Sequence, residues 1–272
     1  MFLRKVSPSE ESRKLASALS RHGFDICQTF HTSWYNHQLD REGLSLCRLP
    51  AGNALLIANT KRLWPFFLTW LKQQQQQQQQ EGAGTIPPNP LDTFVTSNVT
   101  TLVRQHVGDD NNFKIFWDHD WDKDKLVSMS RLASVSGLCY LHPTALLSIH
   151  PEYGPWISLR AVVVLCNNND TDAASVSLVV TDPPPAPGSL SNPLSAEQDA
   201  IVREAAKRAF EHAHVFDQGS SASTGTEAAA RPWIALRDSV PIGRSYRFSD
   251  RQLTYHYIKD VRLLEEEIQT MT

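Results

Sequence analysis

The 272-residue sequence lacks the features that mark several large classes of protein. Its four cysteines (Cys27, Cys47, Cys139 and Cys166) lie far apart and form no CxxC pair, which argues against a zinc site or a dense disulfide framework. No run approaches the roughly 18 apolar residues that a membrane span needs. Residues 1–14 are too polar for the apolar core of a signal peptide, so we expect a cytoplasmic protein.

An excess of positive charge is also missing. The net charge is −3 and the pI is near 6.4, which excludes a basic field that would attract a nucleic-acid backbone. The sequence contains no GxSxG, Walker A or GxGxxG motif, so serine-nucleophile and P-loop chemistry are disfavoured. The loop 118–124 alternates aspartates but lacks the central glycine and final glutamate of an EF-hand, and we assign no metal site.

Three segments have the composition of insertions rather than of a core. Residues 73–90 combine eight glutamines with a proline-rich stretch, and we expect this insert to be disordered. Residues 167–193 and 217–231 are expected to be flexible loops, the first interrupted by a strand-like run at 175–180. Residues 1–272 are expected to form a single domain that includes these insertions.

Hydrophobic periodicity predicts strands interleaved with helices. We expect an ordered loop or strand at 24–35 and a helix rich in small residues at 127–141. Further helices are expected at 8–20, with Ser9 as N-cap and Gly23 at its end, and at 61–72, 91–106 and 194–216, the last with a capping box of Ser195 and Gln198. Strands are expected at 44–49, 54–59, 113–117, 146–150 and 156–166. This pattern indicates an α+β fold built on an antiparallel-rich sheet.

The segment from Ser148 to Arg160 is the first candidate site. As a hairpin with a tight Pro/Gly turn, it would place Trp156 and Arg160, four residues apart, on one face. The arginine would offer a bidentate fork for a carboxylate or phosphate, and the tryptophan a flat wall. On spacing alone, a buried hairpin with a structural ion pair is the stronger reading. Arg237, followed by Asp238, likewise has a local ion pair as its plain alternative.

Three groups of residues, in order, resemble a known family. His22–Asp25 followed by Ser33–Asn36, Ile149–Trp156 running into Ser158–Leu165, and Trp233–Asp238 followed by Arg247–Asp250 are similar to motifs of the cyanocobalamin reductase and alkylcobalamin dealkylase family. The resemblance spans residues 22–262 apart from the insertions. It implies a nitroreductase-like α+β fold with a smaller cap region.

The resemblance also implies an activity and its cofactors. Family members bind cobalamin base-off and remove its upper axial ligand: cyanide reductively with a reduced flavin (FMN or FAD), and alkyl groups by attack of glutathione. In such chemistry the protein supplies positioning and electrostatics, while cobalt carries the redox change. An arginine cluster that holds the glutathione carboxylates corresponds here to Arg160, Arg237 and Arg262.

The positions that contact the corrinoid and its nucleotide tail also carry over by motif. They are Asp118, Val127, Ser128, Met129, Ser130, Leu141, His142, Pro143, Ser148, Trp156 and Leu159. Ser148 stands where the family often has cysteine, and Leu141-His142-Pro143 replaces a polar run. Backbone hydrogen bonds survive such changes, whereas the side-chain bonds do not.

Two other functions remain open at this point. One is a non-catalytic cobalamin carrier, which would bind the corrinoid but show no glutathione-dependent dealkylation. The other is a flavin-dependent reductase with no corrinoid role, which the altered 141–143 run favours. Besides cobalamin and glutathione, the candidate partners are a downstream cobalamin-trafficking protein and a second copy of the chain.

Overall fold

The structure is a computed structural model that describes residues 10–80, 86–87, 89–166, 190–217 and 227–271. Its contacts divide the chain into two compact units. The sheet unit comprises Met1–Asn59, Ser97–Leu141 and Ser158–Ser191, and the helical unit comprises Thr60–Thr96, His142–Ile157 and Asn192–Thr272. The boundary at residues 96 and 97 falls inside one long helix, so each unit is built from separated stretches of sequence. The single-domain organisation stays a prediction.

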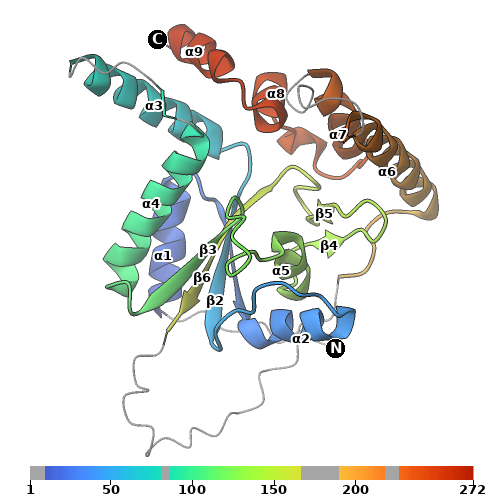
Figure 1. Ribbon diagram of the computed structural model, residues 1–272, viewed down its shortest axis with the longest axis horizontal. Helices are drawn as coiled ribbons and strands as arrows, with labels where there is room; N and C mark the ends of the chain where they lie inside the picture. The colour runs from blue at the N-terminus through green and yellow to red at the C-terminus, as the bar shows by residue number, and fades with distance from the viewer. Residues whose placement is uncertain (1–9, 81–85, 88, 167–189, 218–226, 272) are drawn as a thin grey trace, which may run out of the picture. The chain divides into compact units, whose positions relative to one another are not determined.

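An antiparallel four-stranded sheet forms the centre of the sheet unit, in the order β1-β2-β6-β3 (Figure 1). The strands are β1 (Ile26–His31), β2 (Asn53–Asn59), β3 (Phe113–Trp117) and β6 (Ser158–Leu165). Both central strands, β2 and β6, are buried along nearly their whole length, as expected for strands covered on both faces. Figure 1 shows α1 on one side of the sheet and α5 on the other. The predicted α+β class with an antiparallel sheet is confirmed.

The sheet unit also contains α1 (Glu10–Arg21), α2 (Thr32–Glu42), α5 (Met129–Val135), the second half of α4 (Pro90–Val107) and the short strand β4 (Tyr140–Leu141). Helix α1 ends as its sequence predicts, because Gly23 adopts a positive φ of 89° and Phe24 N–H donates to the Leu19 carbonyl. The mixed segment 24–35 divides into β1 and the start of α2.

The strand predicted at 44–49 is wrong. Gly43 ends α2 in the left-handed conformation, and the following residues run without regular structure. Their backbone groups find other partners: the Asn36 side chain bonds both the N–H and the carbonyl of Leu49, and Cys47 N–H donates to the Leu126 carbonyl. These bonds satisfy the backbone without a neighbouring strand.

The helical unit contains the remaining elements. They are α3 (Leu63–Gln80), the first half of α4, β5 (Ser148–Ile149), α6 (Ala196–Asp217), α7 (Glu227–Asp238), the short 3-10 helix η2 (Arg244–Tyr246), α8 (Asp250–Ile258) and α9 (Val261–Thr270). Helices α6 and α7 lie side by side (Figure 1). The predicted capping box starts α6, with Ser195 and Gln198 each bonding the other's backbone N–H.

Two segments expected to be irregular are helical. Gln73–Gln80 continues α3 rather than forming a disordered insert, because glutamine is a good helix former and here it extends a helix that is already nucleated. Helix α7 begins at Glu227, within the loop predicted for 217–231, since the run Glu-Ala-Ala-Ala favours a helix. The run at 175–180 and the proposed cap at Ser9 lie outside the described residues.

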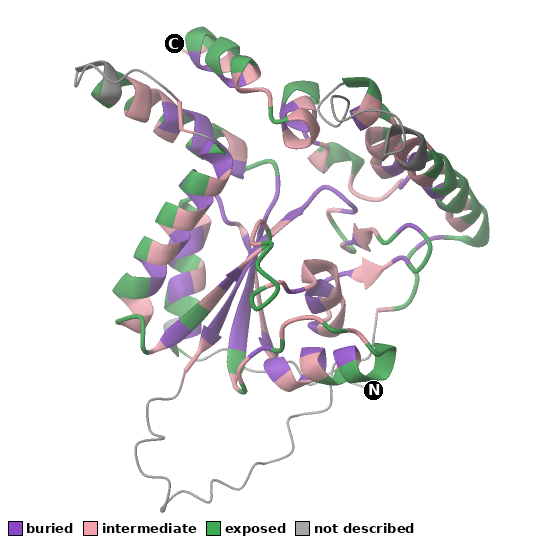
Figure 2. Cartoon of the chain, in the orientation of Figure 1, coloured by how far each residue is buried: buried purple, intermediate pink, exposed green. Residues whose placement is uncertain are grey.

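An aromatic cluster forms part of the core of the helical unit. Phe67 of α3 packs at centroid distances of 5.8 Å from Phe94 and 6.3 Å from Tyr255, and Trp64 donates from Nε1 to Glu267 of α9 at 2.6 Å. Figure 2 shows the resulting pattern, in which the helices bury one side and expose the other. No helix among the described residues has the length and apolar character that crossing a membrane requires.

Candidate functional site

Arg160 lies in the middle of the sheet, at an irregularity in β6. Ile57 of β2 pairs with Ala161 and the next residue, Ala58, pairs with Leu159, so Arg160 has no partner in the β2 register. Such a bulge bends the strand and changes the direction of the bulged side chain. The hairpin predicted from 146–150 and 156–166 is therefore wrong, because β6 pairs with β2 and β3, and Trp156 precedes the strand.

The guanidinium of Arg160 has internal partners. Its Nε donates to Asn59 Oδ1 at 2.8 Å, and its Nη1 lies 3.9 Å from Asp118 Oδ2. Arg160 is only 4% exposed, while the Asp118 side chain is 28% exposed. The Asp118 N–H also donates to the Arg160 carbonyl. The structure thus brings two predicted site residues together, as a buried arginine and its carboxylate.

The other predicted corrinoid residues of the sheet unit gather around the start of α5. The Ser128 N–H donates to the Tyr35 hydroxyl at 2.9 Å, and the Ser128 and Ser130 hydroxyls are 3.4 Å apart. Burial raises the pKa of the Tyr35 phenol, which keeps it neutral. Val127 is buried, whereas Met129, Leu141 and Leu159 are half-buried.

In the helical unit, the turn after β5 is built by a histidine and a glycine. His150 Nδ1 accepts the backbone N–H groups of Glu152 and Tyr153 at 3.1 and 3.2 Å, and a backbone bridge joins His150 to Gly154. Burial lowers the pKa of His150, with Glu152 opposing that shift, so the neutral ring that accepts these bonds is favoured. The Pro/Gly turn expected from the sequence is thus a closed loop.

This turn packs backbone against backbone on the segment before η2. A Cβ on Gly154, whose φ is 58°, would collide with the Ile242 carbonyl, and one on Gly243 would collide with the Tyr153 carbonyl. Both positions therefore require glycine for space as well as for conformation. The Tyr246 hydroxyl adds a hydrogen bond to Glu152 at 2.8 Å. The Ile149–Trp156 part of the second motif group is thereby held against the segment between the two parts of the third group, within the helical unit.

Arg247 joins this packed region to the two following helices. It donates to Asp238 at the end of α7 through two nitrogens, at 2.7 and 3.1 Å, and to Asp250 at the start of α8 at 2.7 Å. The same guanidinium lies 5.6 Å from the ring centroid of Trp156. The hydrogen bond to Asp238 is the largest cause of the raised pKa of Arg247. The motif comparison placed Arg247 in the third motif group without assigning it a role.

Three predicted site residues of the helical unit have a buried polar atom with no hydrogen-bond partner among the described residues. They are Arg237 (Nη1), Trp156 (Nε1) and Ser148 (Oγ). Trp156 is 1% exposed and packs edge-on against Phe248 at 6.1 Å. A buried polar atom without a partner costs free energy that a ligand group can recover. These atoms therefore suit a ligand with carboxylate and amide groups.

Arg237 lies on the last turn of α7, with its guanidinium 5.9 Å from the ring centroid of Tyr257 in α8. Burial raises the pKa of Tyr257, and the nearby Arg237 opposes part of that rise. An arginine with an unused buried donor beside a neutral phenol suits an anionic group. Arg262, in contrast, is 84% exposed in its side chain and pairs with Asp260.

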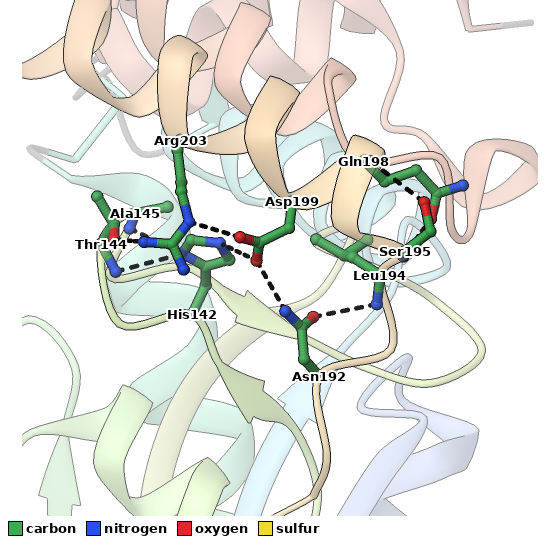
Figure 3. A network of polar contacts seen from close by, with 9 residues as sticks. All are labelled: His142, Thr144, Ala145, Asn192, Leu194, Ser195, Gln198, Asp199 and Arg203. Atoms are coloured by element: carbon green, nitrogen blue, oxygen red, sulfur yellow. Dashed lines mark hydrogen bonds and ion pairs between the residues drawn. The ribbon is translucent and has the colours of Figure 1, made fainter.

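His142 is fully buried and has partners within the helical unit, and its corrinoid contact stays a prediction. Its Nδ1 accepts the N–H groups of Thr144 and Ala145, and its Nε2 bonds Asp199 of α6 at 3.1 Å (Figure 3). The proton therefore sits on Nε2. Asp199 also accepts from Arg203, the largest cause of its lowered pKa, and from Asn192. The network fastens the 142–147 turn to α6, while Pro143 is exposed.

A cavity of about 1000 Å³ lies between α6 and α7. Its floor is formed by small and apolar residues that include Ala200, Ile201, Ala205 and Pro232, and charged residues such as Glu204 and Arg231 also line it. None of the predicted glutathione or cobalamin residues lines this cavity. It is a separate feature of the helical unit.

Burial makes two of the four cysteines poor nucleophiles. Burial raises the pKa of Cys27 and of Cys139 to about 12, and it also raises that of the half-buried Cys47. All four thiols are free. Because the thiolate is the reactive form, Cys27 and Cys139 are inert near neutral pH.

The comparisons with known proteins identify the fold. The chain is similar to the crystal structure of the C. elegans B12-trafficking protein CblC, described as a homologue of human MMACHC, with a TM-score of 0.66 and 17% identity. The match covers 96% of this chain and 97% of that one. No family model and no curated protein sequence matches. The fold is thus the CblC-like fold that the motifs predicted.

Proposed function

We propose that this chain, which has the CblC fold, binds cobalamin base-off and removes its upper axial ligand. The observation that carries the proposal is the fold match along nearly the whole of both chains, to a protein that handles B12. The three motif groups that resemble the cobalamin-processing family supply the second line of support. They were identified from residues 22–262, over the same part of the chain.

The corrinoid is the substrate, and the chain's own residues fit it in part. The buried Trp156 Nε1 and Ser148 Oγ lack partners among the described residues, and corrin side chains and the nucleotide tail are rich in amide and phosphate acceptors. The sheet unit, taken by itself, has the Ser128 and Ser130 hydroxyls and Asp118 as its own polar groups among the predicted corrinoid positions. Ser148, which replaces the family's cysteine, keeps a hydrogen-bond donor at this position, because its hydroxyl still donates.

Glutathione is the proposed thiol, and Arg237 Nη1 has no hydrogen-bond partner among the described residues. Arg237 Nη1 is the buried donor that a glutathione carboxylate would use, and the Tyr257 phenol beside it stays neutral. We retain Arg160 and Arg262 in the proposal as the other two arginines. The proposal gives Arg237 the largest share, because Arg160 already serves Asn59 and Asp118 and Arg262 already serves Asp260.

The proposed dealkylation needs no reacting group from the chain itself. The glutathione thiol loses its proton to solvent, and the thiolate sulfur attacks the cobalt-bound carbon. The S–C bond forms as the Co–C bond breaks, the electron pair stays on cobalt, and the products are the thioether and cob(I)alamin. The protein binds and orients the thiolate, which raises its effective concentration at the carbon.

Removal of cyanide is the second proposed activity. A reduced flavin, FMN or FAD, would supply the electron that converts cob(III)alamin to cob(II)alamin and weakens the bond to cyanide. The buried Trp156 Nε1 and Ser148 Oγ, which lack hydrogen-bond partners among the described residues, suit the pyrimidine edge of a flavin as well as a corrinoid amide. A carrier without catalysis is the alternative that the trafficking role of the similar protein favours.

The test is a visible-spectrum titration of cyanocobalamin with the purified protein, followed by methylcobalamin with glutathione under anaerobic conditions in the dark. The proposal predicts a base-off shift on binding, and then loss of the methylcobalamin spectrum only when glutathione and protein are both present. A shift without dealkylation would select the carrier. Bound yellow flavin with no shift at saturating protein would select a flavin reductase and contradict the proposal.

A further inference from the structure

Arg247 holds three parts of the helical unit through one guanidinium. Nε and Nη2 grip Asp238 at the end of α7, Nη1 binds Asp250 at the start of α8, and the cation lies 5.6 Å from the Trp156 centroid. All of these partners belong to the same unit, and the Arg247 side chain is 32% exposed. No glutathione or corrinoid position was assigned to Arg247 by the motifs.

The three parts carry the two proposed ligand sites. Asp238 directly follows Arg237, whose carbonyl accepts the Val240 N–H, so the grip on Asp238 fixes the turn that bears Arg237. Asp250 begins the helix that bears Tyr257. Trp156 carries one of the buried donors assigned to the corrinoid. Arg247 thus sets the separation of Arg237 and Tyr257 and also contacts the Trp156 ring.

We propose that Arg247 is a positioning residue that couples glutathione binding at Arg237 to corrinoid binding at Trp156. The inference rests on the proposed function and deepens it by assigning the link between its two ligands. A carboxylate bound to Arg237 holds the end of α7, and this restrains Asp238 and with it the Arg247 plane over Trp156. A corrinoid that binds Trp156 then meets a ring already held in place. By thermodynamic linkage the effect is equal in both directions.

The chemistry of the position requires arginine. The planar fork bonds Asp238 with two parallel donors while a third nitrogen reaches Asp250, and its flat face lies toward the indole. A lysine keeps the positive charge but has a single nitrogen, so it cannot make the fork and the ring contact at once. Arg247→Lys therefore separates geometry from charge.

The experiment measures the dissociation constant of glutathione by calorimetry, with and without saturating cyanocobalamin and without flavin, in wild type, Arg247→Lys and Arg251→Lys. Arg251 is the matched control, since it is an exposed arginine nearby on α8 whose ion pair with Glu266 is long, at 3.4 Å. Asp238→Asn is the second variant, which loosens the same grip from the other side and serves if Arg247→Lys does not fold. Thermal melts show which variants are folded.

In wild type and Arg251→Lys, cyanocobalamin is expected to lower the dissociation constant of glutathione about 5-fold or more, the usual lower range for coupled sites. In Arg247→Lys and Asp238→Asn the ratio is expected to fall to within about 2-fold of one, while each ligand alone still binds. Equal weakening of both ligands with an unchanged ratio would show that Arg247 is only structural and overturn the inference. Uncoupled binding of both ligands by wild type would overturn it too and leave the proposed function standing. Absence of corrinoid binding by wild type would instead reject the proposed function, and the inference with it.

Discussion

Each unit holds one motif arginine with buried guanidinium atoms, and the two differ in how those atoms are paired. In the sheet unit, Arg160 sits at a bulge of β6 with Asn59 and Asp118 as partners. In the helical unit, Arg237 has a buried Nη1 without a partner among the described residues. A motif alone cannot tell these states apart, because it records the residue and not the acceptors around it. Under the proposed function, we expect Arg160 to contribute mainly to stability and Arg237 mainly to ligand binding.

The largest expected effect tests how tightly the helical unit is built. Gly154→Ala should destabilise the protein by about 3 kcal/mol or more, because the left-handed conformation is strained and the new Cβ collides with the Ile242 carbonyl. Gly43→Ala in the sheet unit is the matched control, since its φ of 64° is similar but its Cβ would meet nothing within 4 Å. It should cost only about 1–2 kcal/mol. Urea unfolding measures both, and equal losses would contradict the close packing of the two motif groups.

The next prediction tests the two arginines directly. Arg160→Met should lower the free energy of unfolding by about 2–3 kcal/mol, because Asn59 and Asp118 lose a charged partner. Arg237→Met should leave stability nearly unchanged and weaken glutathione binding about 10- to 100-fold. Urea unfolding and glutathione calorimetry on both variants measure whether one loses stability and the other loses affinity. If Arg160→Met loses the greater share of glutathione affinity, the assignment of the two roles is wrong.

Alkaline pH should distinguish the units by their thiols, because all four cysteines belong to the sheet unit. The pKa of Cys27 and that of Cys139 are each raised to about 12, so the folded state holds these protons more tightly than the unfolded chain. Their stabilising contribution is complete below about pH 9 and is lost as pH rises toward 12, by up to about 1.4 kcal/mol per pH unit for each thiol.

The measurement is urea unfolding between pH 8 and 10.5 in wild type and in the double variant Cys27→Ala, Cys139→Ala. The variant should show a shallower decline of stability with pH. Identical slopes would mean that these two thiols are not protected by burial.

The smallest effect is expected at the third arginine of the motif. Arg262→Ala should change glutathione affinity by less than about 2-fold, because its exposed side chain is already paired with Asp260 and exposed pairs contribute little. Calorimetry under the same conditions as for Arg237→Met measures it. A loss as large as that of Arg237→Met would mean that Arg262 leaves Asp260 to take the ligand.

Much of the fold followed from local pattern. The strand at 113–117, the helix that became α4 and the capping box of α6 depend on periodicity and capping within a few residues, and the structure has them. The strand expected at 44–49 failed because the Asn36 side chain supplies the hydrogen bonds that a neighbouring strand would give. The prediction of disorder for the glutamine tract was also wrong, because this tract extends an existing helix.

The candidate site was harder to read, because its geometry depends on distant residues. Periodicity predicted that Trp156 and Arg160 share one face of a hairpin. In the structure β6 pairs with β2 and has a bulge at Arg160, so the two side chains do not have that relation. Gly154 lies against the Ile242 carbonyl, about 90 residues away in the sequence. Arg247 bridges two helices, because it binds Asp238 at the end of α7 and Asp250 at the start of α8. Nothing in the spacing indicates either. Glycines at both 154 and 243 are the one signal that a close backbone approach was present.

The central claim is that the helical unit presents Arg237 to glutathione beside a bound corrinoid, and the most direct measurement is the rate of methylcobalamin dealkylation as glutathione is varied. Wild type should lose the methylcobalamin spectrum with a saturable dependence on glutathione. Arg237→Met should need a glutathione concentration about 10-fold higher or more for half-saturation, while it still shifts cyanocobalamin to base-off. The same half-saturating concentration in both proteins, or no dealkylation by wild type, would contradict the account.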